Sequence, residues 1–84
     1  MKKSILITGG AGYIGTMLVP LLLENDYSVT VYDSLIFKSG DKLLEHLINP
    51  NFNFIKGDIR DKDSLSNAVK NKDVVIHLAA YVGY

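Results

Sequence analysis

A cluster of glycines near the start of the chain carries the clearest chemical signal. Gly10, Gly12 and Gly15 have the spacing Gly-x-Gly-x-x-Gly, and Gly9 opens a second frame, Gly-x-x-Gly-x-x-Gly, over the same stretch. Glycine here lets a chain turn sharply from a strand into a helix and lets the backbone approach a diphosphate closely. The unpaired amides and positive dipole end of that helix stabilise phosphate charge without a lysine. The turn therefore predicts a diphosphate site, although glycines also mark ordinary turns.

An acidic residue follows the turn at the distance that a ribose contact requires. Asp33 ends the β-branched stretch SVTVYD, roughly 20 residues after the glycines. Its carboxylate would accept hydrogen bonds from ribose hydroxyls and repel a 2′-phosphate, which predicts NAD rather than NADP. No arginine stands nearby, and Lys38 is the residue that could oppose this preference. The simpler interpretation is a solvated aspartate in a turn.

Two later segments are candidates for the rest of a dinucleotide site. Asp58 and Ile59 follow the stretch FNFIK, where a loop at the carboxyl edge of a sheet could contact adenine. The alternative is that Asp58, with Asp61 and Asp63, serves the start of a helix.

The segment after residue 73 ends in small and apolar residues. Leu78, Ala79 and Ala80 would let a cofactor backbone pass because they are small or apolar. His77 is interpreted as structural, because the preceding run VVI is expected to be buried and no partner at suitable spacing makes the imidazole a general base.

These residues depend on alternating strands and helices. Strands are expected at Ser4–Thr8, Ser28–Asp33, Phe52–Lys56 and Asp73–His77, and helices from Gly12 to about Asn25, at Asp41–Ile48 and at Asp61–Val69. Pro20 is expected to kink the first helix near Thr16 without dividing it. Such alternation predicts an α/β fold, a Rossmann-type parallel sheet of strand order 3-2-1-4, the first half of a doubly wound fold. The fourth strand would be an edge, so self-association is expected.

Composition limits the other classes of function. The 84 residues carry nine basic and nine acidic side chains, so no net charge attracts nucleic acid or an acidic membrane. No apolar run approaches the roughly 20 residues that span a bilayer. The sequence has no cysteine, which removes disulfides and thiolate metal sites and favours a cytoplasmic protein. We expect no metal site, no nucleic acid and no membrane partner.

Four motifs together resemble the extended short-chain dehydrogenase/reductase family: TGGAGYIG at 8–15, VYDS at 31–34, GDIRD at 57–61 and HLAA at 77–80. The likeness covers the whole chain and is greatest to NAD-dependent nucleotide-sugar epimerases and dehydratases. It implies that cofactor-binding roles fall on Gly9, Gly12, Tyr13, Ile14 and Gly15 at the pyrophosphate, Asp33 and Ser34 at the adenosine ribose, Asp58 and Ile59 at adenine, and Leu78, Ala79 and Ala80 on the nicotinamide side.

The family's catalytic residues are a Tyr-x-x-x-Lys pair with a nearby Ser or Thr, in which the tyrosine exchanges a proton while nicotinamide takes a hydride. Tyr81 and Tyr84 cannot belong to such a pair, because its lysine would fall at or beyond position 85. No catalytic residue is therefore expected, and residues 1–84 are interpreted as a partial NAD-binding domain from the N-terminal part of a nucleotide-sugar enzyme. A non-catalytic dinucleotide sensor and a truncated fold without function are the alternatives. The sugar and the reaction stay open.

Overall fold

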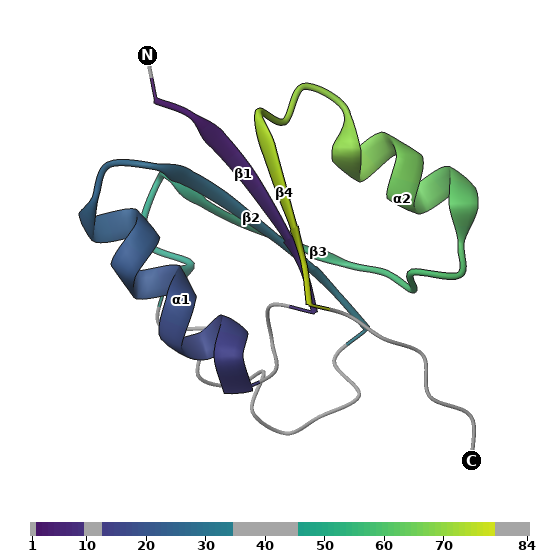
Figure 1. The fold of residues 1–84 in the computed structure, drawn as a ribbon, viewed down its shortest axis with the longest axis horizontal. Helices are drawn as coiled ribbons and strands as arrows, with labels where there is room; N and C mark the ends of the chain where they lie inside the picture. Colours follow the sequence, from purple (N-terminus) through teal and green to yellow (C-terminus); the bar gives the residue numbers. More distant parts are fainter. Residues whose placement is uncertain (1, 10–12, 35–45, 79–84) are drawn as a thin grey trace.

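The structure, a computed structural model, describes residues 2–9, 13–34 and 46–78 (Figure 1). Within these ranges lie four strands and two helices. The strands are β1 (Ser4–Thr8), β2 (Ser28–Asp33), β3 (Phe52–Lys56) and β4 (Val74–His77), and the helices are α1 (Tyr13–Glu24) and α2 (Lys62–Val69). The strands form one parallel sheet in the order β3-β2-β1-β4, so the predicted fold class and strand order are confirmed.

The register brings the carboxyl ends of the strands level with one another. Thr8, the last residue of β1, lies opposite Tyr32 of β2 and His77 of β4. Asp33 lies opposite Lys56 at the end of β3. All four strands therefore end at the same edge of the sheet, which is where ligands bind in open parallel sheets.

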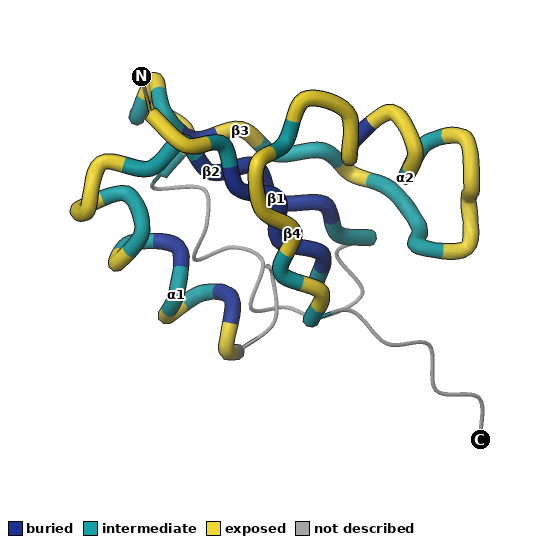
Figure 2. Tube along the Cα trace, turned by 45° about the horizontal axis from the view of Figure 1, so that its top comes forward, coloured by how far each residue is buried: buried dark blue, intermediate teal, exposed yellow. Residues whose placement is uncertain are grey.

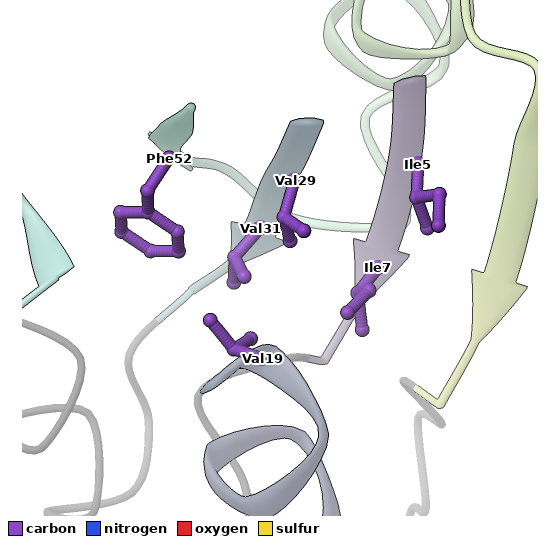
Figure 3. Close-up of a cluster of buried hydrophobic side chains, with 6 residues drawn as sticks. All are labelled: Ile5, Ile7, Val19, Val29, Val31 and Phe52. Carbon is purple, nitrogen blue, oxygen red and sulfur yellow. The ribbon is translucent and has the colours of Figure 1, made fainter. Parts of the chain in front are cut away.

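One face of the sheet packs against α1. Alternate strand residues point to opposite faces, so the odd positions of β1 and β2 share this face. Their side chains meet one residue from α1 and one from β3 in a buried cluster (Figure 3): Ile5, Ile7, Val29, Val31, Val19 and Phe52. Because both flanking layers are apolar, β1 carries the near-continuous hydrophobic run typical of a strand buried on two faces.

The opposite face packs against α2. Leu6 and Tyr32 are completely buried there with Ala68 of α2, and Leu65 packs at the margin. The two helices thus cover opposite faces of the sheet (Figure 1).

The described helix ends follow their sequence signals. α1 is one element with Pro20 inside it, and Asp26, with φ of 69°, follows its end in the left-handed region. The Asp61 side chain accepts from the Ser64 N–H at 3.1 Å and so caps α2, whereas Asn71, with φ of 63°, follows its last turn. Asparagine and aspartate adopt this conformation more readily than other non-glycine residues, which explains why these helices end there.

The expectation that β4 is a buried run was wrong. Val74 and Val75 are 41% and 44% exposed, and the strand is largely yellow in Figure 2. β4 pairs with β1 along one side and is the last strand in the order, so it has the edge position that was predicted. The self-association expected from that edge stays a prediction.

The predicted helix over 41–48 falls mainly on residues 41–45, which lie outside the described residues. Its last residues form a turn rather than an α-helix, in which the Asn49 N–H donates to the His46 carbonyl at 2.9 Å. Among the described helices, none has the length and apolar character needed to cross a membrane.

Candidate functional site

The carboxyl edge of the sheet brings together the loops that the sequence singled out. Three backbone hydrogen bonds join neighbouring segments just beyond the strands. The Leu78 N–H donates to the Thr8 carbonyl at 2.8 Å, the Gly9 N–H to the Tyr32 carbonyl at 2.9 Å, and the Gly57 N–H to the Asp33 carbonyl at 3.0 Å. The first residues after β1, β3 and β4 are therefore held beside the ends of neighbouring strands.

In its described residues, the first of these segments has features expected of a diphosphate site. Gly9 has a φ of 75°, a left-handed conformation that favours glycine. α1 starts at Tyr13, and Gly15 in its first turn is buried, as close packing of helix on sheet requires. Ile14 is 62% exposed. Gly12 lies outside the described residues. A helix of twelve residues thus begins next to the turn and directs its dipole there.

The acid at the end of β2 lies beside this turn. Asp33 and Ser34 are half-buried, and Asp33 directly follows Tyr32, whose carbonyl accepts from the Gly9 N–H. Asp33, the predicted ribose-binding residue, therefore lies close to Gly9 of the predicted diphosphate turn.

Asp58 is held by Arg60. The carboxylate accepts from Arg60 Nε at 3.0 Å through Oδ1, from Nη2 at 2.6 Å through Oδ2, and from the Arg60 backbone N–H at 2.8 Å. The side-chain hydrogen bonds of Arg60, followed by the backbone one, lower the pKa of Asp58 to about 2. The carboxylate is 42% exposed. Asp58 is not the cap of α2, since Asp61 has that role.

Tyr32 lies beneath the turn after β3 that carries Asp58. Its role was not predicted from the sequence. Its hydroxyl donates to the Asp58 carbonyl at 2.7 Å, and its oxygen is 3.0 Å from Ser64 Oγ. The one available signal was a phenol among the apolar residues of SVTVYD, because a buried tyrosine hydroxyl needs a hydrogen-bond partner. Sequence spacing does not show that this partner is 26 residues away.

The fourth segment continues from β4. His77 Nδ1 is hydrogen-bonded to the buried Thr8 hydroxyl, which gives the imidazole a partner in the sheet. Leu78 is half-buried against the α1-face cluster. Ala79 and Ala80 lie outside the described residues. Within the described ranges, no group of three or more His, Cys, Asp or Glu residues could hold a metal ion.

Comparison with known proteins decides the family. The model of the NAD dependent epimerase/dehydratase family matches residues 5–84. The chain belongs to the NAD-dependent epimerase/dehydratase family. The resemblance found in the four motifs is therefore confirmed, and the description of the epimerase/dehydratase family itself names NAD, the predicted cofactor.

Several known proteins are similar to this chain. A UDP-N-acetyl-alpha-D-glucosaminuronate decarboxylase of Bacillus cytotoxicus is 43% identical over 83 residues, which are 99% of this chain and 25% of the relative. A dTDP-glucose 4,6-dehydratase of Bacillus anthracis, solved in complex with NAD, has a TM-score of 0.80 and 33% identity over 94% of this chain and 27% of its own. The Bordetella bronchiseptica enzyme WbmG, solved with NAD and UDP, has a TM-score of 0.81 and 28% identity over 95% of this chain and 26% of its own.

The chain thus spans about a quarter of the length of these epimerase/dehydratase relatives. The similar region includes the sheet edge described above, from Gly9 to Leu78. Because a decarboxylase and a dehydratase share it, this region does not by itself distinguish the reactions of the family.

Proposed function

We propose that this chain binds NAD at the carboxyl edge of its sheet and serves as the cofactor-holding part of a nucleotide-sugar epimerase or dehydratase. The observation that carries the proposal is the hydrogen bond from Gly9 to Tyr32. It joins a left-handed glycine turn, followed by α1, to the strand end that carries Asp33. This contact supports a diphosphate subsite at the glycine turn beside a ribose subsite at Asp33.

Each segment of the edge has a proposed part of the cofactor to hold. Backbone amides of the glycine turn and the start of α1, with Tyr13, Ile14 and Gly15, bind the diphosphate, and Gly12 leaves room for it. The Asp33 carboxylate accepts hydrogen bonds from the ribose hydroxyls, the Ser34 hydroxyl hydrogen-bonds to the same ribose, and the charge of Asp33 disfavours a 2′-phosphate.

The other two segments complete the cofactor site. Asp58 and Ile59 flank adenine on the turn that follows β3. Leu78, with Ala79 and Ala80 beyond it, borders the nicotinamide end. Support for this arrangement comes from the backbone hydrogen bonds that hold Gly9, Gly57 and Leu78 beside the neighbouring strand ends.

The reaction proposed for the whole enzyme is a transient hydride transfer. NAD supplies the hydride acceptor when bound, and the residues of this chain bind and orient it. The tyrosine and lysine that exchange the proton are proposed to lie outside residues 1–84. The proposed substrate is a nucleotide sugar, supported by the UDP found with WbmG and by the sugar nucleotides in the names of the other two relatives.

Gly12→Val in the full chain tests the proposal. The valine side chain fills the space assigned to phosphate, so NAD binding measured by isothermal titration calorimetry is expected to be lost while the far-UV circular dichroism spectrum is kept. Wild-type protein is expected to bind NAD more tightly than NADP. Ser66→Val, which places the same side chain at an exposed position of α2, is the matched control and should bind NAD normally. Equal NAD affinity of the Gly12→Val and wild-type proteins contradicts the placement of the diphosphate.

A further inference from the structure

The turn between β3 and α2, residues 57–61, packs over a buried side chain of β2. The Tyr32 ring is completely buried, and its hydroxyl donates to the Asp58 carbonyl at 2.7 Å. The same oxygen lies 3.0 Å from Ser64 Oγ in the first turn of α2. Tyr32 therefore contacts both the turn and the helix that follows it.

The shape of the turn matches the Tyr32 ring. A Cβ atom at Gly57 would lie 2.5 Å from Cζ and 2.6 Å from Cε2 of that ring, far closer than carbon atoms approach. Glycine at position 57 thus lets the backbone pass directly over the phenol. The ring and the turn fit each other, and neither can move alone without losing this contact or the hydrogen bond.

This contact lies between two predicted parts of the adenosine subsite. Asp33 is the next residue after Tyr32, and its carbonyl accepts from the Gly57 N–H at 3.0 Å. Asp58 follows Gly57 and is held through its own carbonyl by the Tyr32 hydroxyl. Movement of the phenol would therefore change the distance between the two acids.

We infer that Tyr32 is a positioning residue for the adenosine end of the cofactor: it fixes the turn that carries Asp58 and Ile59 relative to Asp33 without touching the ligand. This inference rests on the proposed function. Arg60 orients the carboxylate of Asp58, whereas Tyr32 orients the backbone, so the two contacts have separable effects.

Tyr32→Phe in the full chain tests the inference with AMP as the probe, because AMP carries adenosine and one phosphate. Loss of one hydrogen bond to the turn is expected to weaken AMP and NAD binding by about three- to tenfold, the factor that a net hydrogen bond contributes. Binding of nicotinamide mononucleotide should not change. Tyr27→Phe removes the same hydroxyl just before β2, at the end of the strand away from the site, and should leave AMP affinity unchanged.

Hydrogen exchange of the protein without ligand provides a second readout. The Ile59 and Arg60 amides should exchange faster in Tyr32→Phe, whereas the amides of β1 should keep their wild-type rates once global stability is accounted for. A merely structural role would raise exchange across the whole sheet instead. If Tyr32→Phe does not unfold cooperatively, Ser64→Ala replaces it as the variant, and its AMP affinity is expected to fall about twofold.

The outcomes separate this inference from the proposed function. Wild-type protein that binds NAD and AMP, with equal AMP affinity in Tyr32→Phe, overturns the positioning role and leaves the proposed function standing. If Ser64→Ala is used instead, unchanged AMP affinity likewise overturns the positioning role of Tyr32 and leaves the proposed function standing. Wild-type protein that binds neither ligand overturns both. Weakened AMP binding with unchanged nicotinamide mononucleotide binding and locally faster exchange supports the role of Tyr32.

Discussion

The two faces of the sheet are stabilised in different ways. The α1 face is filled by six apolar side chains from β1, β2, β3 and α1, which contact one another through hydrocarbon surfaces. The α2 face has a smaller buried cluster, and its largest member, Tyr32, ends in a hydroxyl bonded to the Asp58 carbonyl. Apolar packing is nondirectional, whereas a hydrogen bond fixes a direction. The α1 face thus supports the fold as a whole, and the α2 face connects packing to one loop of the candidate site.

Truncation on the α1 face is expected to have the largest effect on stability. Ile5→Ala should lower the free energy of unfolding by about 2–5 kcal/mol, because it removes buried methyl groups and leaves a cavity. Urea denaturation measures the change. Ile5 lies at the end of β1 away from Gly9, so AMP affinity of the folded protein should stay within about twofold of wild type. A larger loss of affinity would show that the two faces are not separable in this way.

Overpacking on the α2 face is expected to have an intermediate effect. Gly57→Ala should cost about 1–3 kcal/mol, because its Cβ meets the buried Tyr32 ring. The cost should fall in a Tyr32→Leu background, where the ring is absent, so a double-mutant cycle measured by urea denaturation should give a nonzero coupling. Additive effects of Gly57→Ala and Tyr32→Leu would argue against the fit between ring and turn.

Removal of the Asp58 partner is expected to have the smallest effect. In Arg60→Met the pKa of Asp58 should rise from about 2 toward its ordinary value of 3.8, because the hydrogen bonds from Arg60 are lost. A lowered carboxyl pKa stabilises the folded state at pH values above the unfolded pKa, and this contribution disappears as the pH falls toward 2. Since the group is exposed, the change in stability should be slight.

Carbon-detected nuclear magnetic resonance of the carboxyl group, followed through a pH titration, measures the Asp58 pKa. Lys62→Met is the matched control, because it removes a positive charge at the start of α2 and keeps the Arg60 hydrogen bonds that lower the pKa. Its titration midpoint should stay near the wild-type value. An unchanged midpoint in Arg60→Met would mean that Arg60 does not hold the carboxylate in solution.

The sequence predicted the sheet well because its signals are local. The bounds of β1, β2 and β3 agree with the predicted ranges, since each strand is a short β-branched or aromatic run ended by a turn residue. The predicted helix at Asp61–Val69 likewise agrees with α2, which Asp61 caps. Strand order followed from the first half of a doubly wound fold, and it brought the ends of β2 and β3, with Asp33 and the turn that carries Asp58, to one edge.

Burial and pairing across the sheet were less predictable. The run VVI before His77 has the composition of a buried strand, but exposure depends on how far the covering helices reach, which no local pattern records. The contact of Tyr32 with Asp58 joins residues far apart in the sequence, and the pair of Asp58 with Arg60 depends on the conformation of a turn. The residues were visible in the sequence, but their partners were not.

The three bonds that join Leu78 to Thr8, Gly9 to Tyr32 and Gly57 to Asp33 all run between main-chain atoms. Substitution of a side chain therefore leaves each donor and acceptor in place. The exception is a substitution to proline at a donor position, which removes the N–H. The outline of this edge can therefore persist while the loops change in sequence, and loop side chains can be altered without rebuilding the frame.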